Sequence, residues 1–89
     1  MPIVRFTDNI QRHVACPPRD VPGVTVHDAL DGYFLTNEAA RGYVHDDQGR
    51  LRRHMAVFVD GRQIRDRDGL SDRVSPDTVV DVVQSLSGG

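Results

Sequence analysis

Three stretches of the chain alternate apolar and polar residues, which is the pattern of a strand with one buried face. They cover residues 2–6, 53–60 and 78–84. Residues 10–15 and 63–65 predict two further, shorter strands. Because Asp60-Gly61 is a typical hairpin turn sequence, we expect the strand at 53–60 to fold back on residues 63–65.

One segment between these strands has helical spacing. Apolar residues recur at three- and four-residue intervals from Val26 to Phe34, so we predict a helix over residues 26–36. Thr25 and Asp28 stand three residues apart at its start, in the arrangement of a capping box. Residues 37–42 predict a further helical turn. Adjacent prolines make residues 16–20 an expected break in regular structure.

The order of these elements predicts the fold class. It is α+β, with a mixed four- to five-stranded sheet and one main helix packed on one face. If the first and last strands are neighbours at the centre of the sheet, both of their apolar runs are buried, which is the β-grasp arrangement. We therefore expect a β-grasp domain over residues 1–84, followed by a C-terminal tail at residues 85–89.

The last strand carries a register prediction. If Asp81 points to solvent, Val80 and Val82 lie inside the fold, and Val79 and Val83 lie outside. The same reasoning places Phe58 outside on the neighbouring strand. An exposed apolar group of this kind suggests a partner-docking face. The predicted docking residues are Phe58, Val79, Val83 and Arg62.

Composition limits the function classes. A chain of 89 residues forms at most one domain, with little room for a deep catalytic cleft. Its net charge of −2 argues against a nucleic-acid or membrane-surface partner. We expect a cytoplasmic protein, because the N-terminus has no signal-peptide pattern and one cysteine cannot build a disulfide framework. We also expect it to be a monomer when free.

Candidate catalytic groups are scarce. The four histidines and Cys16 do not fall at metal-ligand spacings, so we expect no metal site. There is no phosphate-binding glycine-rich motif, and no nucleophile–base pair is evident. The alternating charges around Arg62, Arg65 and Arg67 are typical of a solvated surface, although docking of an acidic partner there stays open.

The sequence printed for the chain ends in Gly88-Gly89. Glycine has no Cβ, so this pair can thread a channel too narrow for other residues. At neutral pH the α-carboxyl group is ionised. Two readings are open from this feature: a reactive terminus presented to another protein, or an unstructured end.

These pieces together resemble the ubiquitin-like sulfur carriers of the MoaD/ThiS family, and most of all their CysO-like branch. The resemblance covers nearly the whole chain. It rests on the segment at 49–61, on Gly69-Leu70, on the turn at 76–79 and on the terminal glycines. Pro76-Asp77 and the tail sequence Ser85-Leu86-Ser87 depart from the usual family pattern.

The resemblance implies a carrier rather than an enzyme. A ubiquitin-activating-type adenylating enzyme would use ATP and Mg to attach AMP to the Gly89 carboxylate, while this chain binds no cofactor. Leu86, Ser87 and Gly88 would thread the partner's active site. Sulfur would convert Gly89 to a thiocarboxylate, which a downstream synthase would use to make cysteine, molybdopterin, thiamine or a thio natural product.

Two alternatives remain open at this point. The chain could be a ubiquitin-like modifier conjugated to proteins through Gly89, or a β-grasp interaction module that does not use its terminus. All eleven basic residues are arginine, so the chain has no lysine side chain that could accept another copy of itself.

Overall fold

A computed structural model describes residues 1–84, so the predicted tail at 85–89 lies outside the described residues. Eight elements follow one another along the chain. In order they are β1 (Ile3–Phe6), α1 (Asp8–Gln11), β2 (Arg19–Asp20), α2 (Val26–Phe34), α3 (Glu38–Val44), β3 (Met55–Val59), β4 (Arg62–Gln63) and β5 (Val79–Gln84).

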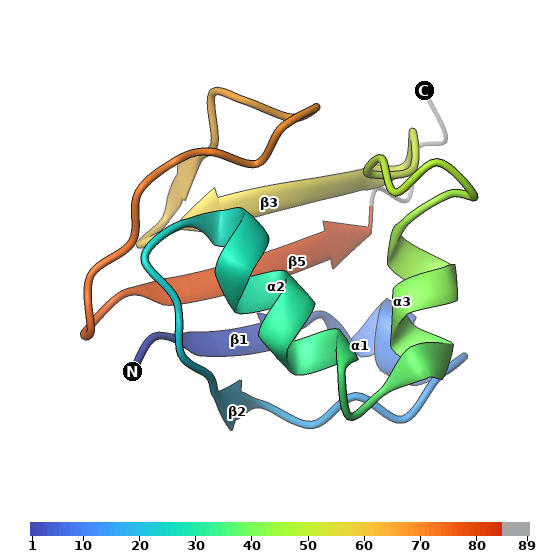
Figure 1. Cartoon of the computed structure of the whole chain (residues 1–89). Helices are drawn as coiled ribbons and strands as arrows, with labels where there is room; N and C mark the ends of the chain where they lie inside the picture. The colour runs from blue at the N-terminus through green and yellow to red at the C-terminus, as the bar shows by residue number, and fades with distance from the viewer. Residues whose placement is uncertain (85–89) are drawn as a thin grey trace.

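The strands form one mixed sheet in the order β2-β1-β5-β3-β4. β1 and β5 are parallel neighbours at its centre, with Val4 opposite Val80 and Phe6 opposite Val82. β3 runs antiparallel to β5 on the other side. Figure 1 shows α2 crossing one face of this sheet, with α3 beside it. The predicted β-grasp fold with terminal strands at the sheet centre is confirmed.

The core lies between the sheet and α2. Val4 and Phe6 of β1 and Val82 of β5 are buried beneath the helix. Tyr33 of α2 packs on Phe6 with ring centroids 4.9 Å apart. Its hydroxyl donates a hydrogen bond of 2.6 Å to the carbonyl of Pro17, so the polar end of this buried ring is satisfied.

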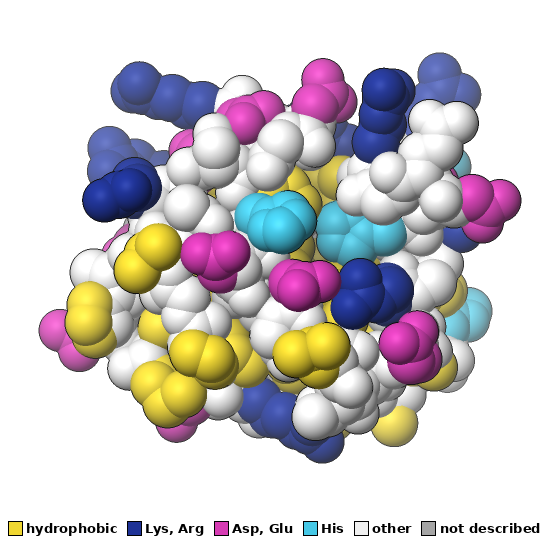
Figure 2. Space-filling model, viewed as in Figure 1, with side chains coloured by type: hydrophobic (Ala, Val, Ile, Leu, Met, Phe, Trp, Pro, Cys, Tyr) yellow, Lys and Arg dark blue, Asp and Glu magenta, His cyan; other side chains and the backbone are white. Residues whose placement is uncertain are grey.

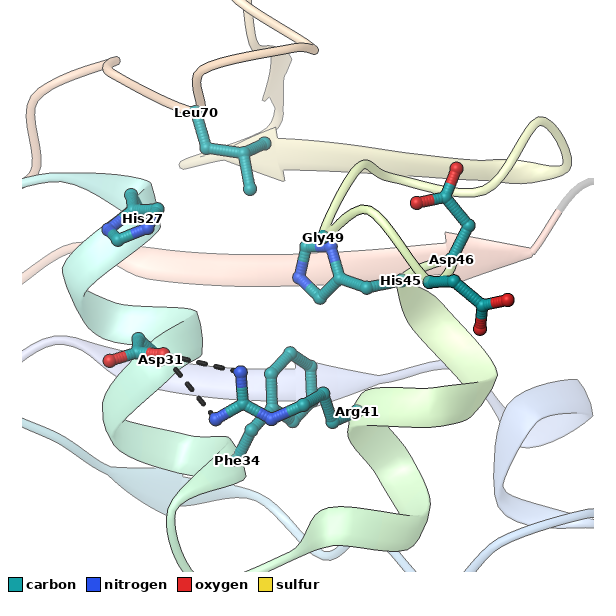
Figure 3. Close-up of a pocket in the computed structure, with 9 residues that line it drawn as sticks. His27, Asp31, Phe34, Arg41, His45, Asp46, Gly49 and Leu70 are labelled. Carbon is teal, nitrogen blue, oxygen red and sulfur yellow. Dashed lines mark hydrogen bonds and ion pairs between the residues drawn. The ribbon is translucent and has the colours of Figure 1, made fainter.

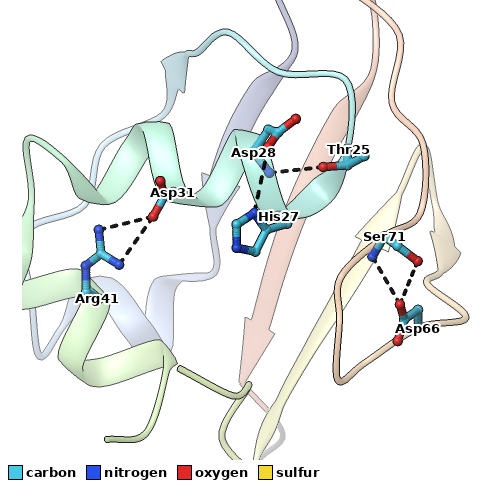
Figure 4. Close-up of polar contacts among 7 residues, drawn as sticks. All are labelled: Thr25, His27, Asp28, Asp31, Arg41, Asp66 and Ser71. Carbon is cyan, nitrogen blue, oxygen red and sulfur yellow. Dashed lines mark hydrogen bonds and ion pairs between the residues drawn. The ribbon is translucent and has the colours of Figure 1, made fainter. Parts of the chain in front are cut away.

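Helix α2 begins where the capping pattern predicts. The Thr25 hydroxyl accepts a hydrogen bond of 3.1 Å from the backbone N–H of Asp28, as Figure 4 shows. The helix ends at Phe34, two residues before the predicted end, and exposed Leu35 follows as its C-cap. The helical turn predicted at 37–42 is longer than expected and forms α3, in which the Asn37 side chain accepts from the N–H of Ala40.

Two predictions near the N-terminus are wrong. Residues 10–15 do not form a strand, because Asp8–Gln11 is a short helix in which the N–H groups of Ile10 and Gln11 donate to the carbonyl of Thr7. This helix begins after Thr7 and buries Ile10 completely. The expected break at 16–20 contains the two-residue strand β2, which pairs with β1 at the sheet edge.

The second half of the chain follows its predicted order with shorter strands. Asp60 and Gly61 both adopt positive φ, at 49° and 85°, as a tight hairpin turn requires. The following loop buries Leu70. Asp66 organises this loop by accepting hydrogen bonds from the N–H of Gly69 and the hydroxyl of Ser71.

Candidate functional site

The sheet face that α2 leaves uncovered carries the predicted docking residues. In β5, Val80 and Val82 are fully buried, whereas Val79 and Val83 are half-buried on the opposite face. Phe58 of β3 lies directly across from Asp81 and is also half-buried. The predicted register is therefore correct, and it gathers Phe58, Val79 and Val83 on one side of the sheet.

An ion pair occupies the middle of this outer face. The Arg5 guanidinium donates two hydrogen bonds to the Asp81 carboxylate, from Nε at 2.8 Å and from Nη2 at 3.0 Å. Asp81 raises the pKa of Arg5 through this contact, so the guanidinium stays charged. Phe58 and Val83 border a shallow hollow of about 480 Å³ beside the pair. The outer face thus combines apolar side chains with one fixed charge pair.

Arg62 does not share this face. The register of β3 and β4 places Arg62 opposite Val59 and Gln63 opposite Phe58. Residues directly opposite in an antiparallel pair point to the same side of a sheet. Gln63 is therefore the β4 residue beside the apolar side chains, and the inclusion of Arg62 in the face is corrected.

The end of β5 lies against the start of β3 and against α3. Gln84 is the last described residue, and its pairing with Met55 places the start of β3 next to it. The Tyr43 hydroxyl donates a hydrogen bond of 3.0 Å to Oε1 of Gln84. Tyr43 in turn stacks on His13, with centroids 5.4 Å apart.

A hollow of about 310 Å³ opens at the same place, between Tyr43, Arg52, His54 and Gln84. We call this end of the sheet, formed by Tyr43, Arg52, His54 and Gln84, the tail root. The sequence does not predict the tail root, because its residues come from three separate segments. Tyr43 belongs to α3, Arg52 and His54 to the loop before β3, and Gln84 to β5. No periodic pattern links those segments.

Another hollow lies on the helical face, and it contains polar groups. Figure 2 shows two histidine side chains beside a depression at the centre of this face, and Figure 3 labels them His27 and His45. The hollow measures about 290 Å³. Arg41 of α3 reaches Asp31 of α2 at 3.4 Å across it, and its guanidinium lies 5.6 Å from the ring centroid of Phe34.

His45 is the buried titratable group of this region. It is 9% exposed and packs edge-on against Phe34, with centroids 5.4 Å apart. Its Nδ1 is buried and has no hydrogen-bond partner among the described residues. Burial lowers the pKa of His45, so the ring is neutral at neutral pH. Within residues 1–84 no three metal-ligating side chains come together.

The remaining candidate groups have structural partners. Cys16 is buried, and burial raises the pKa of its thiol, which keeps it in the unreactive protonated form. Asp66 and Asp72 have lowered pKa values because they accept hydrogen bonds, from Ser71 and Gly69 and from the N–H groups of Arg65 and Asp66 respectively. In the part of the chain that the structure describes, these carboxylates organise the loop and do not form salt bridges with the neighbouring arginines.

Leu86, Ser87, Gly88 and Gly89, the predicted tail and reactive terminus, lie outside the described residues. None of the helices in residues 1–84 combines the length and the apolar character needed to cross a membrane.

The topology and the two faces of the sheet define a ubiquitin-like β-grasp protein. No family model and no curated protein matches the chain. Solved structures do match it over nearly its whole length, and they include a small archaeal modifier protein and CysO proteins. The resemblance predicted from the sequence is thus confirmed at the level of the structural class.

Three of these structures illustrate the likeness. Small archaeal modifier protein 1 from Haloferax volcanii is 25% identical, with a TM-score of 0.78 and coverage of 99% of this chain and 98% of that one. A chain of the Amycolatopsis orientalis BexX/CysO complex has a TM-score of 0.81 at 18% identity, with both chains fully covered. Mycobacterium tuberculosis CysO, described as an antigen, has a TM-score of 0.78 at 15% identity, with 97% and 100% covered.

Proposed function

We propose that this chain is a sulfur carrier whose reactive group is the carboxylate of Gly89. One observation carries the proposal. The central strand β5, in a fold shared with CysO and the archaeal modifier, ends at Gln84, only four positions before Gly88-Gly89 in the sequence. The fold supplies a rigid body and the sequence supplies a short end without bulky side chains at its last two positions.

The proposed chemistry needs a partner enzyme. A carboxylate is a poor electrophile, because its negative charge is delocalised over two oxygens. Attack of the Gly89 carboxylate on the α-phosphate of Mg-bound ATP forms an acyl-adenylate and releases pyrophosphate. A sulfide sulfur then attacks the acyl carbon, and the bond to AMP breaks with its electron pair leaving on AMP. The product is a Gly89 thiocarboxylate.

The outer sheet face gives the partner a place to dock. Phe58, Val79 and Val83 are half-buried apolar side chains on the side of the sheet without helices. Apolar side chains gathered on the surface of a small protein favour a protein–protein contact. The Arg5–Asp81 pair among them would fix the orientation of that contact. The adenylating enzyme and the downstream synthase are both candidates to use this face.

The experiment that tests the proposal measures ATP–pyrophosphate exchange with the adenylating enzyme of the same organism. We expect Gly89→Ala, and separately an extension by one residue, to reduce exchange by roughly 100-fold, since small misplacements of a reacting group cost about that much. Ser85→Ala keeps both glycines and should exchange like the wild type. Wild-type exchange by Gly89→Ala would contradict the proposal.

A second function follows from the same terminus. The likeness to small archaeal modifier protein 1, at 25% identity, favours a modifier that is joined to lysines of other proteins. Both functions need adenylation and differ only in the acceptor. Conjugation would appear as Gly89-dependent adducts on target lysines, whereas a carrier gives the free thiocarboxylate.

A further inference from the structure

Four arginine side chains belong to the segments around the start of β3, and one of them, Arg52, also lines the tail-root hollow. Arg50, Arg52 and Arg53 precede β3, and all three are exposed. They line one hollow of about 420 Å³ together with His54. Arg67 lies in the loop after β4. Its guanidinium donates hydrogen bonds to the carbonyls of Met55 at 2.7 Å and Arg52 at 3.3 Å, at the start of β3. We call these four residues the tail-root arginines.

These four guanidinium groups have no ion-pair partner within residues 1–84. Among those residues, salt bridges engage Arg5 and Arg41 but none of the tail-root arginines. Arg52 donates instead to the carbonyl of Gly42, at 3.1 Å. Two carboxylates, Asp46 and Asp68, line the same hollow. Asp46 accepts from the N–H groups of Gln48 and Arg50, and the nearby charges of Arg50 and Arg52 also help to lower its pKa, although neither guanidinium forms an ion pair with it.

This local positive charge contrasts with the whole molecule, whose net charge is −2. A small basic cluster on an acidic protein is unsuited to nucleic acid, which requires a basic stripe that follows the phosphate backbone. It suits an acidic patch on another protein, because unpaired surface charges steer a partner of opposite sign and fix its orientation.

The position of the cluster identifies which partner it faces. Met55 pairs with Gln84, the last described residue, and His54 and Arg53 directly precede Met55 in the chain. Gly88 is only four residues beyond Gln84, so a protein that takes up Gly88-Gly89 must come close to this end of the sheet. We infer that the tail-root arginines dock an acidic surface of the adenylating enzyme beside the entrance to its active site. This inference rests on the proposed function and adds a second, electrostatic contact to the apolar outer face.

The test compares two charge reversals of equal size. Arg50→Glu/Arg53→Glu changes the two tail-root arginines whose side chains form no hydrogen bond or ion pair with another described residue. Arg65→Glu/Arg73→Glu makes the same change in net charge around the hollow lined by Val59 and Arg62. Each variant is first checked for wild-type thermal unfolding.

The measurement is kcat/KM for ATP–pyrophosphate exchange with the adenylating enzyme of the same organism. It is made at NaCl concentrations from about 20 to about 500 mM, because the Debye length shortens severalfold over this range and screens surface charges. We expect the Arg50/Arg53 variant to lose roughly tenfold at low salt, with the difference from wild type shrinking as salt rises. The Arg65/Arg73 variant should stay within about twofold of the wild type.

Other results would overturn the inference. Equal losses in both variants would assign the effect to net charge, and a salt-independent loss would assign it to local structure. A gain in kcat/KM would indicate that the arginines hold the chain's own terminal carboxylate. Absence of exchange even with the wild type would instead overturn the proposed function and this inference with it.

Discussion

His45 and Thr25 show how single side chains fix the helices of this protein. Thr25 satisfies an N–H group at the start of α2 that has no partner inside the helix. His45 follows α3 directly and fills the space against Phe34 with a neutral ring. The sequence predicts the role of Thr25 from the local spacing of Thr25 and Asp28. It does not predict burial of His45, because that depends on Phe34 eleven positions earlier.

Removing the Thr25 cap should destabilise the fold measurably. Thr25→Ala leaves the N–H of Asp28 without its acceptor, and we expect a loss of about 1 kcal/mol in the free energy of unfolding. Thr25→Ser keeps the hydroxyl and should remain within about 0.5 kcal/mol of the wild type. Chemical denaturation of the three proteins checks this. Equal stability of the Ala variant and the wild type would show that the cap contributes nothing.

The pKa of His45 predicts a pH dependence of stability. Burial lowers it below the ordinary value of 6.5, so the unfolded chain binds this proton at a higher pH than the folded one. The free energy of unfolding should therefore fall as the pH drops from 7 toward 5. Asp46, Asp66 and Asp72, whose pKa values are lowered from 3.8, lose their stabilising contribution only in more acidic solution.

Two variants separate the effect of His45 from that of the other histidines. His45→Leu should reduce the decline in stability between pH 7 and 5, because the residue that must stay neutral is gone. His27→Gln, at an exposed position, should keep the wild-type decline. Denaturation midpoints measured at half-unit pH intervals provide the comparison. A decline unchanged by His45→Leu would contradict the assignment.

The strands show which features the sequence can predict. Alternation around Asp81 predicts the register of β5 correctly, because one face is covered by α2 and the other is not. The strand expected at 10–15 is wrong because Ile10 is anchored by a short helix that carries no periodic pattern. The tail root and the contacts of Arg67 could not be predicted, since they join segments far apart in sequence.

The two faces of β5 should respond differently to the same truncation. Val82→Ala removes methyl groups from the core and should cost about 2 kcal/mol of unfolding free energy, with little effect on exchange once the protein is folded. Val83→Ala on the outer face should cost less than about 1 kcal/mol. It should raise the KM for the carrier in the exchange assay. The reverse pattern would refute the docking face.

The composition of the whole chain adds a constraint on its chemistry. With eleven arginines and no lysine, the chain has no side-chain amine that an activated Gly89 could acylate. A lysine-free carrier can therefore be activated at high concentration without building side-chain-linked chains of itself. The single amine left for such a reaction is the one at the N-terminus.

The effect of having no lysine can be tested by introducing one side-chain amine. In an activation mixture without a sulfur source, the wild type should give no oligomers joined through side chains, as judged by denaturing gels and peptide mass spectrometry. Arg65→Lys keeps the charge and introduces an exposed acceptor. It should allow Gly89 of one copy to be linked to the new side-chain amine of another. Side-chain-linked oligomers of the wild type would contradict this account.

The central claim is that the Gly89 carboxylate becomes a thiocarboxylate. Intact-protein mass spectrometry, after incubation with the adenylating enzyme, Mg-ATP and sulfide, tests it most directly. The mass should increase by the exchange of one oxygen for one sulfur, and fragmentation should locate this change at Gly89. The increase should be absent without ATP. An unchanged mass would contradict it, as would further residues after Gly89 in the mature protein.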